Sequence, residues 1–143
     1  MTLAAEDEPS AAVARRLVRT YRKDIAHTRV IVTRGYGKLR VQASSYNAAS
    51  VHTPFFLLTD LDRGKCAPGL VEDWLDGRPR EASFLFRVAV REVEAWLLAD
   101  QAGIAKLLGI EKVLVPTDVE GLPDPKRTLV DLARHSSLRD LRR

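Results

Sequence analysis

The sequence predicts an α/β fold of three layers (α/β/α), in which helices cover both faces of a mainly parallel central sheet. Short apolar runs alternate along the chain with segments of helical periodicity, and glycine or proline residues separate them. Strands joined through helices pair in parallel, because a parallel pair needs a long crossover connection. Ligands of such sheets bind beyond the carboxyl ends of the strands, so polar residues there are the first candidates for a site.

The first expected strand, residues 3–5, is short and leads to a helix over residues 10–23. The apolar residues of that helix recur every four positions along one face. Pro9 suits its first turn, because a residue there needs no amide donor. Three acidic residues precede Pro9, where the helix dipole favours negative charge.

Two further strand and helix pairs follow. A β-branched run at residues 30–33 precedes a weaker helix over residues 38–49. Residues 55–59 form an apolar run that ends in a polar residue, which is typical of a buried strand in a parallel sheet. A loop then leads to a helix over residues 69–75.

The last part of the chain predicts a fourth strand, over residues 83–89, and three helices. Apolar periodicity indicates helices over residues 90–100, 101–108 and 126–134. A loop with three prolines precedes the last of them.

Length and composition are those of one globular domain. The chain has 143 residues, of which 45% are hydrophobic and 29% charged. We expect a single domain over residues 1–143, with a core over residues 1–100 and a helical extension over residues 101–143. No apolar run is long enough to cross a bilayer, so no membrane partner is expected. Cys66 is the only cysteine and cannot form an intramolecular disulfide, which favours a reducing compartment such as the cytoplasm.

The chain is basic, with a net charge of +4 and a pI of about 9.5. Its arginines and lysines form three groups, which either contact a polyanion such as nucleic acid or belong to solvated helix faces. The groups are Arg15, Arg16, Arg19, Arg22 and Lys23; Arg34, Lys38 and Arg40; and Arg134, Arg139, Arg142 and Arg143.

The strongest candidate site is acidic. Asp60 and Asp62 follow the long apolar strand and Glu6 follows the first strand, so all three are expected at the carboxyl edge of the sheet. Hard cations such as Mg²⁺ prefer oxygen ligands, and carboxylates held close together repel unless a cation lies between them. The alternatives are that Asp60 caps a turn, that Asp62 pairs with Arg63 or Lys65, and that Glu6 only stabilises the start of a helix.

Two further acids lie about 200° apart on the helix predicted over residues 90–100, so they cannot both face one point. Glu94 falls on the apolar side, where a carboxylate is costly to bury unless it is paired or bound to a metal. Glu92 is expected to pair with an arginine, and at least one of the two acids is expected to be structural.

Other residues of chemical interest have simpler interpretations. Gly35 and Gly37 predict a turn, or else backbone donors for a phosphate at a helix start. The three histidines lack the spacing of metal ligands. Trp74 and Trp96 fit apolar helical positions and are expected in the core.

Four segments of the chain form a recognisable pattern. They are AEDEPS at residues 5–10, FLLTDLD at residues 56–62, FRVAVREVEAWLLAD at residues 86–100 and DPK at residues 124–126. Together they resemble a bacterial family of unknown function with a TOPRIM-like, Rossmann-like fold, which is related to the TOPRIM domains of OLD-type nucleases. The resemblance covers nearly the whole chain.

The resemblance implies a metal-dependent nuclease. The metal ligands that it implies, for Mg²⁺ or Mn²⁺, are Glu6, Asp60 and Asp62. The further candidates that it adds, acids for a second metal and a lysine that stabilises charge, are Glu8, Glu92, Glu94 and Lys126. Relatives occur in mobile-element or phage-defence settings, so a separate ATPase is the protein partner that the resemblance implies. Family members extend beyond this length, which implies that the chain ends early at Arg143.

Three functions compete at this stage. The first is a metal-dependent phosphodiesterase, a nuclease acting on DNA or RNA, in which Lys126 or Arg91 contacts the phosphate. The second is a non-catalytic TOPRIM-like module that binds nucleic acid or a protein partner. The third is nucleotidyl transfer, or the hydrolysis of a small phosphorylated molecule.

Overall fold

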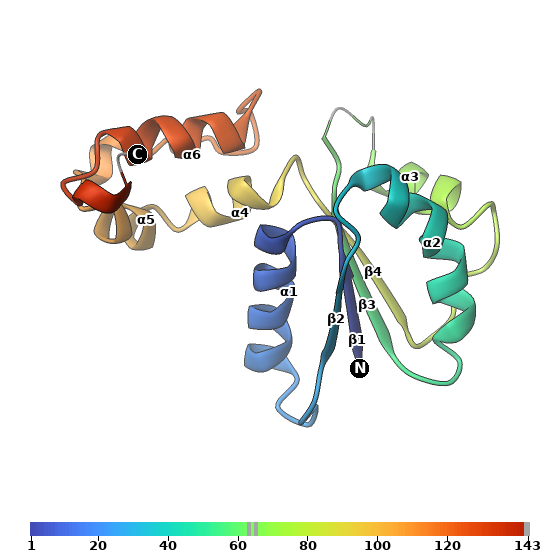
Figure 1. Cartoon of the computed structure of the whole chain (residues 1–143). Coiled ribbons are helices and arrows are strands. Elements are labelled where there is room, and N and C mark those ends of the chain that lie inside the picture. Colours follow the sequence, from blue (N-terminus) through green and yellow to red (C-terminus); the bar gives the residue numbers. More distant parts are fainter. Residues whose placement is uncertain (63, 65, 142–143) are drawn as a thin grey trace. The chain divides into compact units, whose positions relative to one another are not determined.

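The computed structural model describes residues 1–62, 64 and 66–141, without the side chain of Arg139. Its contacts divide the chain into two compact units, Met1–Ala89 and Val90–Arg143. The first unit contains the sheet, and the described part of the second is made of helices and connecting loops (Figure 1).

The first unit contains an entirely parallel four-stranded sheet. In the register of this sheet, Ala5 lies between Val32 and Leu58, and Asp60 lies opposite Ala89. After the first strand, the chain adds the second strand on one side of it and then crosses to add the third strand on its other side. The direction of winding therefore reverses between the first and third strands. The strands are β1 (Thr2–Ala5), β2 (Arg29–Val32), β3 (Phe55–Asp60) and β4 (Phe84–Ala89), in the spatial order β2-β1-β3-β4.

Helices cover both faces of this sheet, which confirms the predicted three-layer α/β/α fold (Figure 1). Helix α1 (Glu8–Tyr21) lies on one face, and α2 (Tyr36–Ala49) and α3 (Ala67–Trp74) lie on the other. Crossovers between parallel strands are right-handed. Because the direction of winding reverses after β2, the helices before and after this point lie on opposite faces of the sheet. The core on the side of α2 and α3 includes Leu39, Ala43, Leu57, Trp74, Phe84 and Phe86.

The described second unit contains helices α4 (Val93–Ala99), α5 (Gln101–Leu108) and α6 (Pro125–Arg134), with 3₁₀ turns at Lys112–Leu114 and Arg139–Leu141. Its apolar cluster contains Leu98, Ile104, Ala105, Leu108 and Val115. None of the described helices is both long and apolar enough to cross a membrane.

Two details predicted for α4 are wrong. The helix begins at Val93, with Glu92 as its N-cap, and not at residue 90. Apolar periodicity through Val90 continues past the point where the backbone becomes helical, so the pattern alone placed the start too early. Trp96 is 38% exposed and does not lie in the core. It lies on the opposite side of the helix from the face that contains the buried residues Ala95 and Leu98.

Asn47 joins the end of α2 to the segment that precedes β4. Its side chain is buried, and its Nδ2 donates to the carbonyl of Pro79 at 2.9 Å. Its Oδ1 accepts from the amide of Glu81, also at 2.9 Å. A buried amide that satisfies two backbone groups holds this loop in one conformation.

Asn47→Ala should lower the free energy of unfolding by about 1–3 kcal/mol, because the Pro79 carbonyl and the Glu81 amide lose these partners. Urea denaturation measures the difference. The matched control is Ser45→Ala, an exposed position on the same helix, which should change the free energy by less than about 0.5 kcal/mol. Equal losses in the two variants would contradict the role given to Asn47.

Candidate functional site

Glu6 follows β1 directly, and its backbone is fixed at the carboxyl edge of the sheet. The amide of Gly35 donates to the Glu6 carbonyl at 3.1 Å, and the amide of Thr33 donates to the Ala5 carbonyl at 3.0 Å. Gly35 has a φ of 139°, a conformation that residues with a side chain rarely adopt. The first glycine of the Gly-x-Gly segment therefore positions Glu6, and its amide is already bonded within the protein.

The Glu6 side chain reaches the end of β3. Its Oε1 accepts from the amide of Asp60 and from the hydroxyl of Thr59, each at 3.4 Å. Both hydrogen bonds are longer than usual, so they orient the carboxylate more than they stabilise it. Glu6 and Asp60, which are distant in sequence, thus converge at one edge, as the sequence predicts.

The neighbouring acids have different roles. Asp7 is the N-cap of α1, and its Oδ1 accepts from the amide of Ser10 at 2.9 Å. Glu8 is exposed and lies 3.8 Å from a nitrogen of Arg15. Asp7 is thus the capping residue of α1, whereas Glu6 bonds to the end of β3.

The pKa of Glu6 is raised above its ordinary value, chiefly because burial disfavours the charged carboxylate. The hydrogen bond from the Asp60 amide lowers this pKa, whereas the negative charges of Asp62 and Asp7 raise it further. The Asp62 carboxylate therefore lies near enough to oppose the ionisation of Glu6. A cation bound at this edge would relieve the repulsion.

The Asp-x-Asp motif spans the end of β3 and a tight turn. Asp60 is buried, at 9% exposure, whereas Asp62 is exposed and has a φ of 49°, which Asp tolerates better than most residues. The Gly64 amide closes the turn by donating to the Leu61 carbonyl at 2.8 Å. A Cβ at Gly64 would lie 2.8 Å from that same oxygen, so the turn requires glycine.

The three acids have the right chemistry for a divalent cation, because carboxylate oxygens are the preferred ligands of Mg²⁺ and Mn²⁺. They do not form a complete ligand shell: within the described part of the chain, no three acidic, histidine or cysteine side chains are grouped to hold a metal ion. The alternative pairing of Asp62 with Arg63 or Lys65 lies outside the described residues.

The other predicted site residues belong to the second unit. The Oε2 atom of Glu92 accepts from the amide of Lys126 at 3.0 Å, in the first turn of α6, where the helix dipole favours a carboxylate. Glu94 is buried, at 7% exposure, in the first turn of α4. The Lys126 side chain is exposed. Glu92 thus has a structural bond to a helix start.

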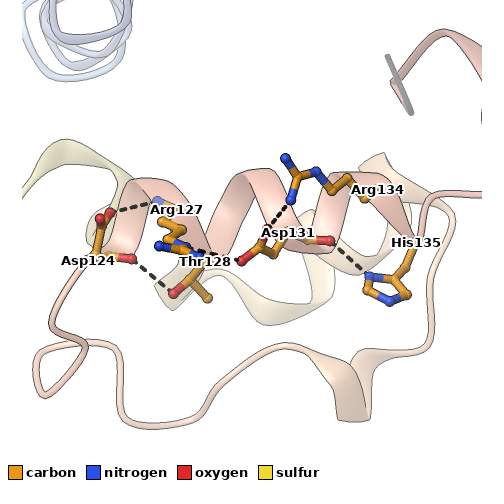
Figure 2. Close-up of polar contacts among 6 residues, drawn as sticks. All are labelled: Asp124, Arg127, Thr128, Asp131, Arg134 and His135. Atoms are coloured by element: carbon orange, nitrogen blue, oxygen red, sulfur yellow. Dashed lines mark hydrogen bonds and ion pairs between the residues drawn. The ribbon is translucent and has the colours of Figure 1, made fainter.

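Polar residues of α6 bond mainly to one another (Figure 2). The Asp124 carboxylate accepts from the amide of Arg127 at 2.7 Å, and its carbonyl accepts from the hydroxyl of Thr128 at 3.0 Å. Further along, Arg134 donates to Asp131 at 2.8 Å. The Asp-Pro-Lys segment therefore forms the capped start of a helix.

Several of the basic residues form exposed ion pairs, which contribute little to stability. Arg142, Arg143 and the side chain of Arg139 lie outside the described residues. The pairs are Arg15–Glu8, Arg22–Asp24, Arg40–Asp73, Arg127–Asp131 and Arg134–Asp131.

Thr59 is the residue of this site that the sequence analysis did not single out. Its side chain is fully buried, and its hydroxyl donates to Glu6. Its position in the sequence could have identified it, because Thr59 is a polar residue at the end of an otherwise apolar run.

Comparisons of the chain with protein-family models, with curated proteins and with solved structures find no significant match. The resemblance to the TOPRIM-like family therefore stays a prediction, which rests on the sequence segments quoted for it. Fold and site together define a parallel α/β domain with acidic residues at the carboxyl edge between β1 and β3.

The raised pKa of Glu6 predicts a pH-dependent effect of Glu6→Gln. A carboxyl whose pKa is higher in the folded state contributes stability below its unfolded pKa, and this contribution is lost as the pH rises through the folded pKa. Glu6→Gln cannot ionise, so its stability relative to wild type should increase between about pH 4 and about pH 7. Urea denaturation at both pH values measures this. Glu8→Gln, the exposed control, should show no such gain, and a pH-independent difference for Glu6→Gln would refute the prediction.

Proposed function

We propose that this protein is a metal-dependent phosphodiesterase, a nuclease that uses Mg²⁺ or Mn²⁺ at the edge formed by Glu6, Asp60 and Asp62. The observation that supports it best is the convergence of Glu6 with the end of β3, where the winding of the sheet reverses. Ligands of open parallel sheets bind at this switch point.

The protein's own residues have distinct tasks in this proposal. Asp60 and Asp62 hold the cation with Glu6, and the Asp60 amide and the Thr59 hydroxyl orient the Glu6 carboxylate. The buried position of Asp60 strengthens its electrostatic attraction to a cation. When bound, a divalent cation activates water and stabilises negative charge on a phosphoryl group.

Residues of the second unit enter the proposal as secondary candidates. Glu94 is preferred to Glu92 for a second metal, because Glu92 already bonds the Lys126 amide. Lys126 and Arg91 are candidates for contacting the phosphate. A separate ATPase partner and a role in mobile-element or phage defence belong to the same proposal and rest on the family resemblance alone.

A second candidate function is a non-catalytic TOPRIM-like module that binds nucleic acid or a protein partner. It is favoured by the incomplete grouping of metal ligands among the residues that the structure describes. In that case the acidic edge would contribute to recognition and not to catalysis.

Metal binding separates these candidates. Titration calorimetry with Mg²⁺ and with Mn²⁺ should detect binding to the wild type, and Asp60→Asn/Asp62→Asn should weaken it at least about 10-fold, since two charged ligands are lost. Asp24→Asn/Asp73→Asn removes two exposed carboxylates elsewhere and should leave binding unchanged. Folded wild-type protein that binds neither ion would favour the non-catalytic module.

Cleavage tests the reaction itself. Purified protein, alone and with its ATPase partner where one exists, should cut labelled DNA or RNA in Mg²⁺ or Mn²⁺, and chelation should stop the reaction. Glu6→Gln and Asp60→Asn should each lower the rate at least about 100-fold, because each removes a direct ligand. Asp24→Asn/Asp73→Asn, which removes two exposed carboxylates elsewhere in the first unit, should keep its activity. Intact substrates under all conditions would exclude the nuclease, and product analysis on free nucleotides would separate it from nucleotidyl transfer.

A further inference from the structure

A groove in the first unit lies between α3 and β4. Its volume is about 530 Å³, which is within the range of small-ligand sites. Its walls come from α3, from the segment that follows α3 and from β4. Two kinds of side chain dominate the lining, the apolar residues Val71, Leu75 and Val88 and the arginines Arg78, Arg80 and Arg87.

The groove is cationic. Its three arginines are exposed, and Glu72 is the one acidic residue among the described residues that line it. In the part of the chain that the structure describes, neither Arg78 nor Arg80 forms an ion pair with a carboxylate. Arg87 uses one N–H group to bond the Phe86 carbonyl at 3.1 Å. The positive charge is therefore available to an anionic ligand.

The sheet register places one end of this groove beside the acidic edge. Val88, on the groove wall, lies opposite Thr59, and the next residue, Ala89, lies opposite Asp60. Neighbouring strands are about 4.8 Å apart, so the groove begins one strand away from the acids. Arg78 and Arg80 precede β4 in the chain and lie toward its amino end. A ligand extended along β4 would run from these arginines to the acidic edge.

The lining matches a ligand with phosphate and a flat apolar part. The arginine guanidinium binds phosphate through two parallel hydrogen bonds. Its attraction to the phosphates of a nucleic acid does not depend on the base sequence. In single-strand grooves the flat faces of the bases pack against side chains, most often aromatic ones, while basic side chains follow the backbone. Val71 and Val88 are partly exposed and offer an apolar contact for a base, whereas Leu75 is buried.

We propose that this groove binds a segment of single-stranded nucleic acid, with phosphates on Arg78, Arg80 and Arg87 and a base on the apolar part of its lining. The inference rests on the proposed function, because it takes nucleic acid as the ligand and the acidic edge as the place that the bound ligand reaches. Binding in the groove uses no metal, so it is measured separately from cleavage.

The test is the affinity of a fluorescent oligothymidylate of about ten nucleotides, measured by anisotropy in the presence of EDTA. Arg78→Ala/Arg80→Ala/Arg87→Ala should weaken binding at least about 10-fold and reduce the slope of log K against log salt by about two. Arg16→Ala/Arg19→Ala/Lys23→Ala removes the same charge from exposed positions on α1 and in the turn that follows it, and should change affinity by less than about 3-fold. Equal losses in both variants would overturn the proposal in favour of unspecific attraction.

A second variant excludes misfolding as the explanation. Glu72→Gln removes the acidic residue of the groove and should tighten binding about 2-fold, which a damaged fold would not do. Polyglutamate should displace the oligonucleotide much less efficiently than unlabelled oligothymidylate does. Equal displacement would overturn the proposal and indicate an acidic polypeptide ligand. Groove binding without any cleavage would leave this inference standing while the nuclease proposal fails.

Discussion

Strand β1 pairs in parallel with β2 on one side and with β3 on the other, and the rest of the first unit depends on this placement. All four residues of β1 are buried, so helices must cover the sheet on both faces. The winding reverses beside β1, and adjacent crossover connections diverge there. Glu6 follows β1 and Asp60 ends β3 on the two sides of this switch point, so the strand order determines the position of the acids.

The direction of the backbone after β1 gives the adjacent acids Glu6 and Asp7 different roles. Glu6 bonds to β3, whereas Asp7 bonds to the first turn of α1. The Gly35 amide ties the Glu6 carbonyl to the loop after β2, and Gly64 closes the turn beyond Asp60. Two glycines and one helix cap therefore hold the acidic edge together, and none of them needs to contact a substrate.

The fold was largely predictable because its signals are local. The apolar run at Phe55–Asp60 and the four-residue periodicity of α1 each identify an element without reference to its neighbours. The site was predictable to the level of the sheet edge, but the sequence could not distinguish Glu6 from Asp7 as the helix cap, since both are acids near one helix start. The bond from the Lys126 amide to Glu92 could not be predicted for a related reason, because it depends on a segment distant in the chain. The arginines of the groove form no recognised motif: Arg78 and Arg80 are close in sequence, and tertiary structure brings them to the same groove as Arg87.

The all-parallel sheet has a consequence for how the chain acquires its structure. Among the residues that the structure describes, no strand pairs with a neighbour through a hairpin, and β1 pairs with β3 only after both intervening crossover helices and β2. Such a topology has a high contact order, and chains of this kind fold slowly because long loops must close before pairing stabilises them. The fully buried β3, with its Phe-Phe-Leu-Leu start, stays unprotected in that interval. The period between synthesis of β3 and completion of the sheet is therefore when this protein is most prone to aggregate.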